Sequence, residues 1–165
     1  MKKLNTRMIA TIGMLVAVEV VLSRFLSINA PSVKIGFAFV PCALCAVLFG
    51  LLPTVILEVL ADLLGATLFP SGAFFPGFTL TAALRGLTYG LLLGKKQTTL
   101  CILLCVLINQ LVLGLLVNTL WISILYGSSF GALVVTRVVQ CLVLIPVEFV
   151  GISAIVKFGK RVKVA

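Results

Sequence analysis

Seven ionisable side chains interrupt the apolar segments of this sequence, and these residues are the best equipped to bind a polar ligand. They are Glu19, Arg24, Glu58, Asp62, Arg85, Arg137 and Glu148. An ionisable group inside a membrane is costly and usually functional. Arginine carries a planar fork of donors that suits a carboxylate. The three arginines therefore predict a site for an anionic ligand.

The composition indicates that these residues are set in a membrane protein. The chain has 165 residues, of which 62% are hydrophobic and 10% are charged, and its mean hydropathy is +1.32. A soluble domain of this size has no room to bury so much apolar surface. Backbone inside a bilayer must satisfy its own hydrogen bonds, which favours helices. We therefore expect an all-α membrane protein with a single domain over residues 1–165.

Six apolar segments are long enough, or nearly so, to cross a bilayer, which takes about 17 to 25 residues. They are Met8–Ile28, Gly36–Leu52, Thr54–Phe69, Gly77–Gly94, Thr98–Ile122 and Phe130–Val156. The second and third are short and separated by little more than Pro53, so they could form one broken hairpin. Lysines and arginines gather before the first segment, at positions 95–96 and after the last. By the positive-inside rule, both termini face the cytoplasm.

The depth of each ionisable residue follows from a rise of about 1.5 Å per helical residue. Arg24, Asp62, Arg85 and Arg137 fall in the outer half of the membrane, Glu19 near the middle, and Glu58 and Glu148 in the inner half. The outer half thus carries a surplus of about two positive charges, which predicts an outward-open cavity for a doubly negative ligand. Two alternatives stay open. Arg24 could reach the outer headgroups, and Asp62 could neutralise Arg85 or Arg137.

The fifth segment adds polar groups along one helical face. Gln110, Gly114, Asn118 and Trp121 follow α-helical spacing. In the sixth segment, Gln140 lies three residues after Arg137, so both can point inward together. Trp121 could instead anchor the chain at the membrane interface. Asn118 and Gln140 could instead bond neighbouring helices.

Several function classes are disfavoured. The five cysteines lie in apolar segments, and the chain has no histidine, so we expect no metal site and no cofactor. The sequence contains no phosphate-binding GxxxxGK[ST] loop and no nucleophile with a base partner, which argues against an enzyme. The basic residues are split among short segments, which argues against nucleic-acid binding.

Residues 69–90, FPSGAFFPGFTLTAALRGLTYG, closely resemble the loop-and-helix signature of the folate-specific S component of energy-coupling factor (ECF) vitamin transporters. The FFPGFTL block is the specific part, and VLSRFLSI at the end of the first segment is also similar. The resemblance implies a subunit of the bacterial cell membrane that captures folate or a reduced folate from outside. It also implies partners, namely a transmembrane coupling protein and two ATPase subunits.

The resemblance also assigns residues. It implies that loops 29–35 and 70–78 gate the site, that Phe74, Phe75, Pro76, Gly77, Phe78 and Thr79 form the gate or pocket wall, and that Arg85 lies in the cavity. Small residues on the first helix would dock the coupling protein, and the candidates here are Ala10, Gly13, Met14 and Ala17. Their alternative role is internal packing. A stand-alone proton- or ion-coupled secondary transporter, or an S component for another anionic vitamin, also remains open.

Overall fold

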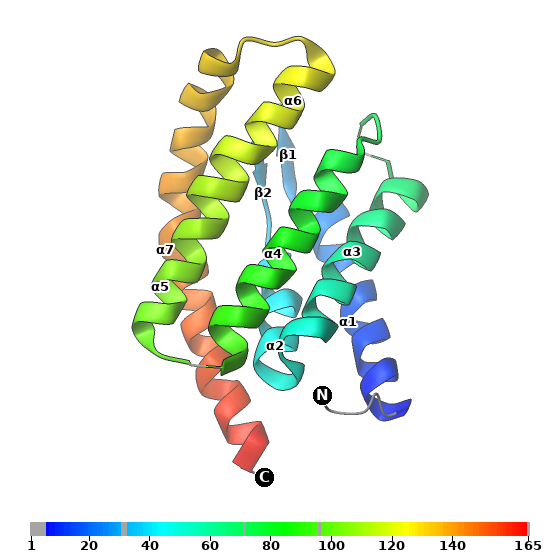
Figure 1. Ribbon diagram of the computed structural model, residues 1–165, viewed down its shortest axis with the longest axis vertical. Helices are drawn as coiled ribbons and strands as arrows, with labels where there is room; N and C mark the ends of the chain where they lie inside the picture. The colour runs from blue at the N-terminus through cyan, green and yellow to red at the C-terminus, as the bar shows by residue number, and fades with distance from the viewer. Residues whose placement is uncertain (1–5, 31–32, 71, 96, 165) are drawn as a thin grey trace.

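A computed structural model gives the fold, and it describes residues 6–30, 33–70, 72–95 and 97–164 (Figure 1). The helices run along one common direction and form a bundle. Their bounds are α1 Thr6–Arg24, α2 Phe39–Phe49, α3 Leu51–Leu68, α4 Pro76–Lys95, α5 Thr99–Leu107, η1 Ile108–Val117, α6 Asn118–Tyr126 and α7 Phe130–Val164. A short hairpin of β1 (Ile28–Ala30) and β2 (Val33–Ile35) follows α1.

The predicted six helices are present in the described residues, because α5, the π-helix η1 and α6 run on as one helix over residues 99–126. Four of the six are long and apolar enough to cross a membrane: Thr6–Arg24, Leu51–Leu68, Thr99–Tyr126 and Phe130–Gly159. The α2 helix has only 11 residues, fewer than the roughly 17 that a span needs. The hairpin was not predicted, and it occupies the first loop, of which residues 31 and 32 lie outside the described part of the chain.

The predicted break at Pro53 is wrong, since the chain turns at Gly50. Gly50 has a φ of +84°, in the region that glycine adopts most readily. Pro53 instead lies in the first turn of α3, where its missing N–H costs no helical hydrogen bond. The two short segments are therefore separate helices joined by one glycine.

Helices α3 and α4 lie close together because two glycines on α4 face the backbone of α3. A Cβ atom on Gly86 would lie 2.8 Å from the Val55 Cα, and one on Gly90 only 2.5 Å from the Leu51 Cα. Such contacts require that no side chain is present. The two helices that carry Glu58, Asp62 and Arg85 are thereby held against each other.

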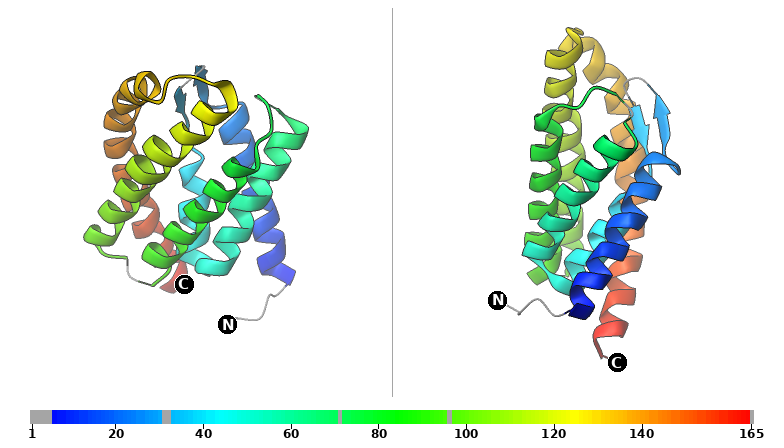
Figure 2. Two further views of the ribbon diagram at one scale, coloured as in Figure 1. Left: turned by 45° about the horizontal axis from the view of Figure 1, so that its top comes forward. Right: turned by 90° about the vertical axis from the view of Figure 1, so that its right-hand side faces the viewer.

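The largest apolar core fills the half of the bundle that contains the two termini, where α2 packs among α4, α5 and α7 (Figure 1). Its fully buried members include Val47, Leu93 and Ile152. The β1–β2 hairpin lies toward the opposite end (Figure 2). Space for a ligand is therefore left toward the end of the bundle away from the termini.

Candidate ligand-binding site

A cavity of about 620 Å³ lies between the helices, and residues from α1, α2, α3, α4, η1, α6 and α7 line it. Its volume falls in the range of about 300–1,000 Å³ typical of small-molecule sites. All seven ionisable residues identified within the apolar segments line it: Glu19, Arg24, Glu58, Asp62, Arg85, Arg137 and Glu148. Ionisable residues from four helices, α1, α3, α4 and α7, thus line a single cavity.

The charge of the cavity differs from the prediction. Three guanidinium groups and four carboxyl groups, which are all the Asp and Glu residues of the chain, line it, so the cavity as a whole has no surplus of positive charge, whereas the surplus was predicted for the outer half of the membrane. Depth along a helix locates a backbone atom, whereas a long side chain reaches several ångströms further. Helical side chains lean toward the N-terminal end of their helix, so Glu148 on α7 leans toward the cavity.

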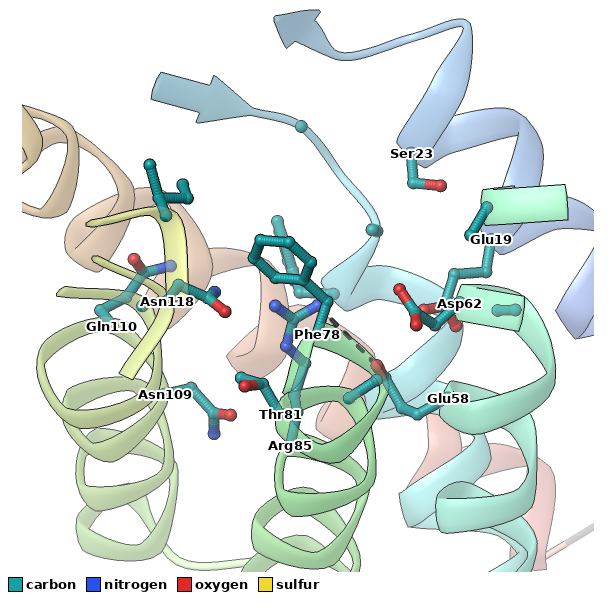
Figure 3. Close-up of a pocket in the computed structure, with 18 of the residues that line it drawn as sticks. Glu19, Ser23, Glu58, Asp62, Phe78, Thr81, Arg85, Asn109, Gln110 and Asn118 are labelled. Carbon is teal, nitrogen blue, oxygen red and sulfur yellow. Dashed lines mark ion pairs between the residues drawn. The ribbon is translucent and has the colours of Figure 1, made fainter. Parts of the chain in front are cut away.

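Arg85 pairs with Glu58 and not with Asp62. An Nη1 atom of Arg85 lies 3.7 Å from Oε2 of Glu58. Glu58 is 2% exposed, while the Arg85 side chain is 35% exposed. Asp62 accepts a hydrogen bond of 2.7 Å from the Thr79 hydroxyl. Figure 3 shows Arg85 rising from α4 between an acidic wall, with Glu58 and Asp62, and an amide wall opposite.

The amide wall comes from the long helix over residues 99–126 and includes Asn109, Gln110 and Asn118 (Figure 3). Gln110 donates a hydrogen bond of 2.7 Å to Glu148. Arg137 donates one of 2.9 Å to the Gly114 carbonyl. Gln140 also lines the cavity. The predicted face of Gln110, Gly114 and Asn118 thus lies at the cavity, together with the predicted residues of α7.

Asn109 is not among the predicted site residues, because α-helical spacing does not place it on the predicted polar face. Residues nine apart, such as Asn109 and Asn118, lie on opposite sides of an α-helix at about 100° per residue. Residues 108–117 form a π-helix, whose wider turn of about 4.4 residues returns positions nine apart to nearly the same side. Both asparagines therefore line one cavity.

The loop before α4 lies along the cavity. Phe74, Phe75 and Phe78 line it, and residue 71 lies outside the described part of this loop. Gly77, Thr79 and Trp121 are not among the lining residues but support those that are. The centroids of the Trp121 and Phe75 rings lie 5.5 Å apart. The Trp121 indole N–H donates a hydrogen bond of 3.0 Å to the Thr81 hydroxyl. A Cβ atom on Gly77 would lie within 2.7 Å of that indole.

Arg24 lies against α3 rather than reaching away from the bundle. A Cβ atom on Gly65 would lie 2.8 Å from the Arg24 Nε and 3.0 Å from one of its terminal nitrogens. The guanidinium group is therefore seated on the bare backbone of Gly65 and faces the cavity. This geometry disfavours the alternative in which Arg24 reaches the outer headgroups.

We expect Gly65→Ala to move Arg24 without unfolding the protein, because the new methyl group meets the end of a flexible side chain. The affinity for an anionic ligand should fall by about tenfold, the effect of weakening one charge-assisted hydrogen bond. Equilibrium binding to the purified protein measures this. The matched control is Gly13→Ala on α1, where a Cβ atom meets nothing within 4 Å. Equal affinities of the two variants would contradict the assignment of Arg24.

A comparison with known protein families identifies the family to which this chain belongs. The family described as ECF transporter, substrate-specific component, matches residues 7–156. The chain belongs to this family. It is accordingly a multi-pass membrane transport protein, as predicted, and not an enzyme. A substrate-specific component is one subunit of a transporter, which disfavours the stand-alone secondary transporter.

Relatives of this ECF component are similar over nearly their whole length. The folate transporter FolT of Clostridium novyi (strain NT) is 36% identical over 165 residues, covering 99% of this chain and 95% of the relative. The folate transporter FolT of Leuconostoc mesenteroides is 34% identical over 158 residues, covering 92% and 84%. A crystal structure of FolT bound with folic acid matches with a TM-score of 0.86 and 34% identity, covering 95% of both chains.

Helix α1, which carries the candidate docking residues of this ECF component, lies at the edge of the bundle (Figure 1). Ala10, Gly13, Met14 and Ala17 are all exposed, and Met14 is 70% exposed. The intervening Ile12, Leu15 and Val16 are buried. The four residues therefore face away from the core of this chain, and Gly13 and Ala17 have small-xxx-small spacing, whereas the pair Ala10 and Met14 contains one large residue.

Proposed function

We propose that the chain binds folate or a reduced folate in the cavity and delivers it to an ATP-driven coupling module. The observation that carries the proposal is the cavity of about 620 Å³, with guanidinium and carboxyl groups on its walls, in a chain whose fold matches FolT bound with folic acid at a TM-score of 0.86. No catalytic step is involved, so the chemistry is recognition alone.

Each part of folate has complementary groups in the cavity. Its two glutamate carboxylates suit guanidinium groups, which bind carboxylates through paired N–H donors, and Arg24, Arg85 and Arg137 supply three. Its pterin and aminobenzoyl rings suit aromatic faces, here Phe75 and Phe78. The Arg85–Glu58 pair leaves Arg85 partly exposed, so the ligand can approach this guanidinium while Glu58 keeps it in place.

The orientation in the membrane follows from charge and from the position of the cavity. Lysines and arginines gather near both termini and at residues 95–96, which supports a cytoplasmic location for these ends. The cavity then opens toward the outside, with the loop before α4 as its gate. We infer six membrane crossings, in which the short α2 contributes only part of the bilayer thickness.

Uptake by cells tests the proposal. Cells that produce this chain together with the coupling protein and two ATPases should accumulate labelled folate, and cells that produce the chain alone should not. Accumulation by the chain alone would favour a proton- or ion-coupled secondary transporter. Accumulation of a different anionic vitamin in place of folate would favour an S component of another specificity.

We expect Gly13→Leu to lower folate uptake at least tenfold while the affinity of the purified protein for folate stays unchanged. The added side chain would prevent close approach of a partner helix to the outward face of α1. Uptake measured beside binding separates the two effects. The matched control is Gly131→Leu on α7, which is equally open. Normal uptake by Gly13→Leu would contradict docking through this face.

A further inference from the structure

Several buried hydrogen-bond acceptors in the wall of the cavity, among them an oxygen of Glu58, have no hydrogen-bond partner among the residues that the structure describes, and two of them flank Gln110. These two are Oδ1 of Asn109 and Oε2 of Glu148. Each side chain is 7% exposed, and both residues line the cavity. A buried acceptor without a hydrogen bond is destabilising. Such a pair therefore indicates a place where a ligand supplies the missing donors.

Both acceptors are held in place by a bond on their other side. The Asn109 amide nitrogen donates to the Cys105 carbonyl at 2.8 Å, so its oxygen is turned away from that bond. Oε1 of Glu148 accepts from the Gln110 amide at 2.7 Å, so Oε2 is the oxygen left over. Side chains fixed in this way lose little further freedom when a ligand binds, which favours affinity.

The π-helix is what brings these acceptors to one cavity. In an α-helix, Asn109 and Asn118 would face opposite sides, and the amide wall would lose one of them. In the π-helix over residues 108–117, Asn109 faces the cavity beside Gln110, which in turn holds Glu148. A π-helical segment is rare and is frequently found at functional sites, which fits a role in shaping this wall.

Two of the other carboxyl groups of the cavity, those of Glu58 and Asp62, are less suited to this task. Glu58 has Arg85 as its counter-charge. Asp62 already accepts a hydrogen bond from Thr79. Glu148 has instead the amide of Gln110 as its neighbour, and a carboxylate beside amides is a strong acceptor for N–H donors.

We propose that Asn109 and Glu148 form a subsite that accepts two N–H donors from the edge of a planar ring. This inference rests on the proposed function, and it assigns the subsite to the pterin of folate, whose amino group and ring N–H lie side by side. The glutamate end of folate then lies toward the arginines. The subsite thereby distinguishes folate from anionic vitamins that lack such an edge.

The experiment compares two ligands on three proteins. The ligands are folic acid and an analogue in which a methyl group replaces the pterin amino group. The proteins are the full chain, Asn109→Leu and Glu148→Gln, each purified in detergent. The unmodified chain should prefer folic acid by about 10- to 100-fold, the effect of one hydrogen bond to a charged group. At least one of the two variants, the one that removes the acceptor of the amino group, should reduce that preference to less than about threefold, and both should bind folic acid more weakly.

Asn118→Leu is the matched control, because it removes an amide from the same long helix and cavity wall. It should lower the affinity for both ligands by the same factor and leave the preference intact. The affinity for the methyl analogue reports whether each variant is folded. Should Asn109→Leu not fold, Asn109→Asp keeps the acceptor and should keep the preference, while Glu148→Gln still tests the subsite.

The outcomes separate this inference from the proposed function. If the unmodified chain does not bind folic acid, the proposed function fails. If the unmodified chain binds both ligands equally, or both variants keep the full preference for folic acid, the subsite is overturned and folate binding stands. Loss of the preference in at least one variant, with the preference kept in Asn118→Leu, supports the subsite.

Discussion

Replacing Arg85 by alanine is expected to abolish folate binding and to destabilise the protein at the same time. Removing one partner of a fully buried ion pair costs about 3–5 kcal/mol, because the other charge is left buried. Arg85 is 35% exposed, so we expect a smaller loss of about 2 kcal/mol, which arises at Glu58 with its exposure of 2%. The affinity for folate should fall at least 100-fold, because a charge-assisted contact with a carboxylate is lost.

The double variant Arg85→Ala/Glu58→Gln separates the two effects. Without the buried carboxylate, the melting temperature in detergent should return to near that of the unmodified chain, while folate binding stays lost. Arg85→Lys should keep the stability and lose part of the affinity, because lysine lacks the planar fork. Folate binding by the double variant at normal affinity would show that Arg85 serves only to neutralise Glu58.

Replacing Gly90 by alanine is expected to be the most destabilising single substitution in the bundle. The added Cβ atom would lie 2.5 Å from the Leu51 Cα and 3.2 Å from the Leu51 carbonyl oxygen. Backbone cannot move aside as a side chain can, so α3 and α4 must separate. We expect a loss of about 3 kcal/mol in the free energy of unfolding, at the upper end of the cost of overpacking.

Thermal unfolding in detergent measures this effect. Gly131→Ala on α7 is the matched control, because a Cβ atom there meets nothing within 4 Å. An open helical site should gain up to about 1 kcal/mol from the same change. Folate affinity of Gly90→Ala should fall as well, since Glu58 and Arg85 sit on the two separated helices. Equal melting temperatures for the two variants would contradict the close approach of α3 and α4.

The number of helices could be predicted from the sequence because each follows from a long apolar segment bounded by proline, glycine or charge. The details that failed depend on a local choice of the backbone. Both Gly50 and Pro53 can end a helix, but proline is tolerated in a first turn, so only Gly50 breaks the chain. The β1–β2 hairpin lies in a loop where apolar periodicity carries no signal.

The candidate site could be predicted in its members but not in its pairings. An ionisable residue in an apolar segment stands out, and all seven line the cavity. Which acid pairs with which arginine depends on how the helices are rotated against one another, and α-helical periodicity does not fix that rotation. Asn109 was missed because nothing in its sequence distinguishes a π-helix from an α-helix.

The measurement that tests the central claim most directly is equilibrium binding of labelled folic acid to the purified chain, with thiamine, riboflavin and biotin as competitors. We expect saturable binding of one folate per chain that a hundredfold excess of each competitor leaves unchanged. A cavity with arginines for two carboxylates and buried acceptors for a pterin should discriminate in this way. The absence of saturable binding, or displacement of folate by any of the three competitors, would contradict the account.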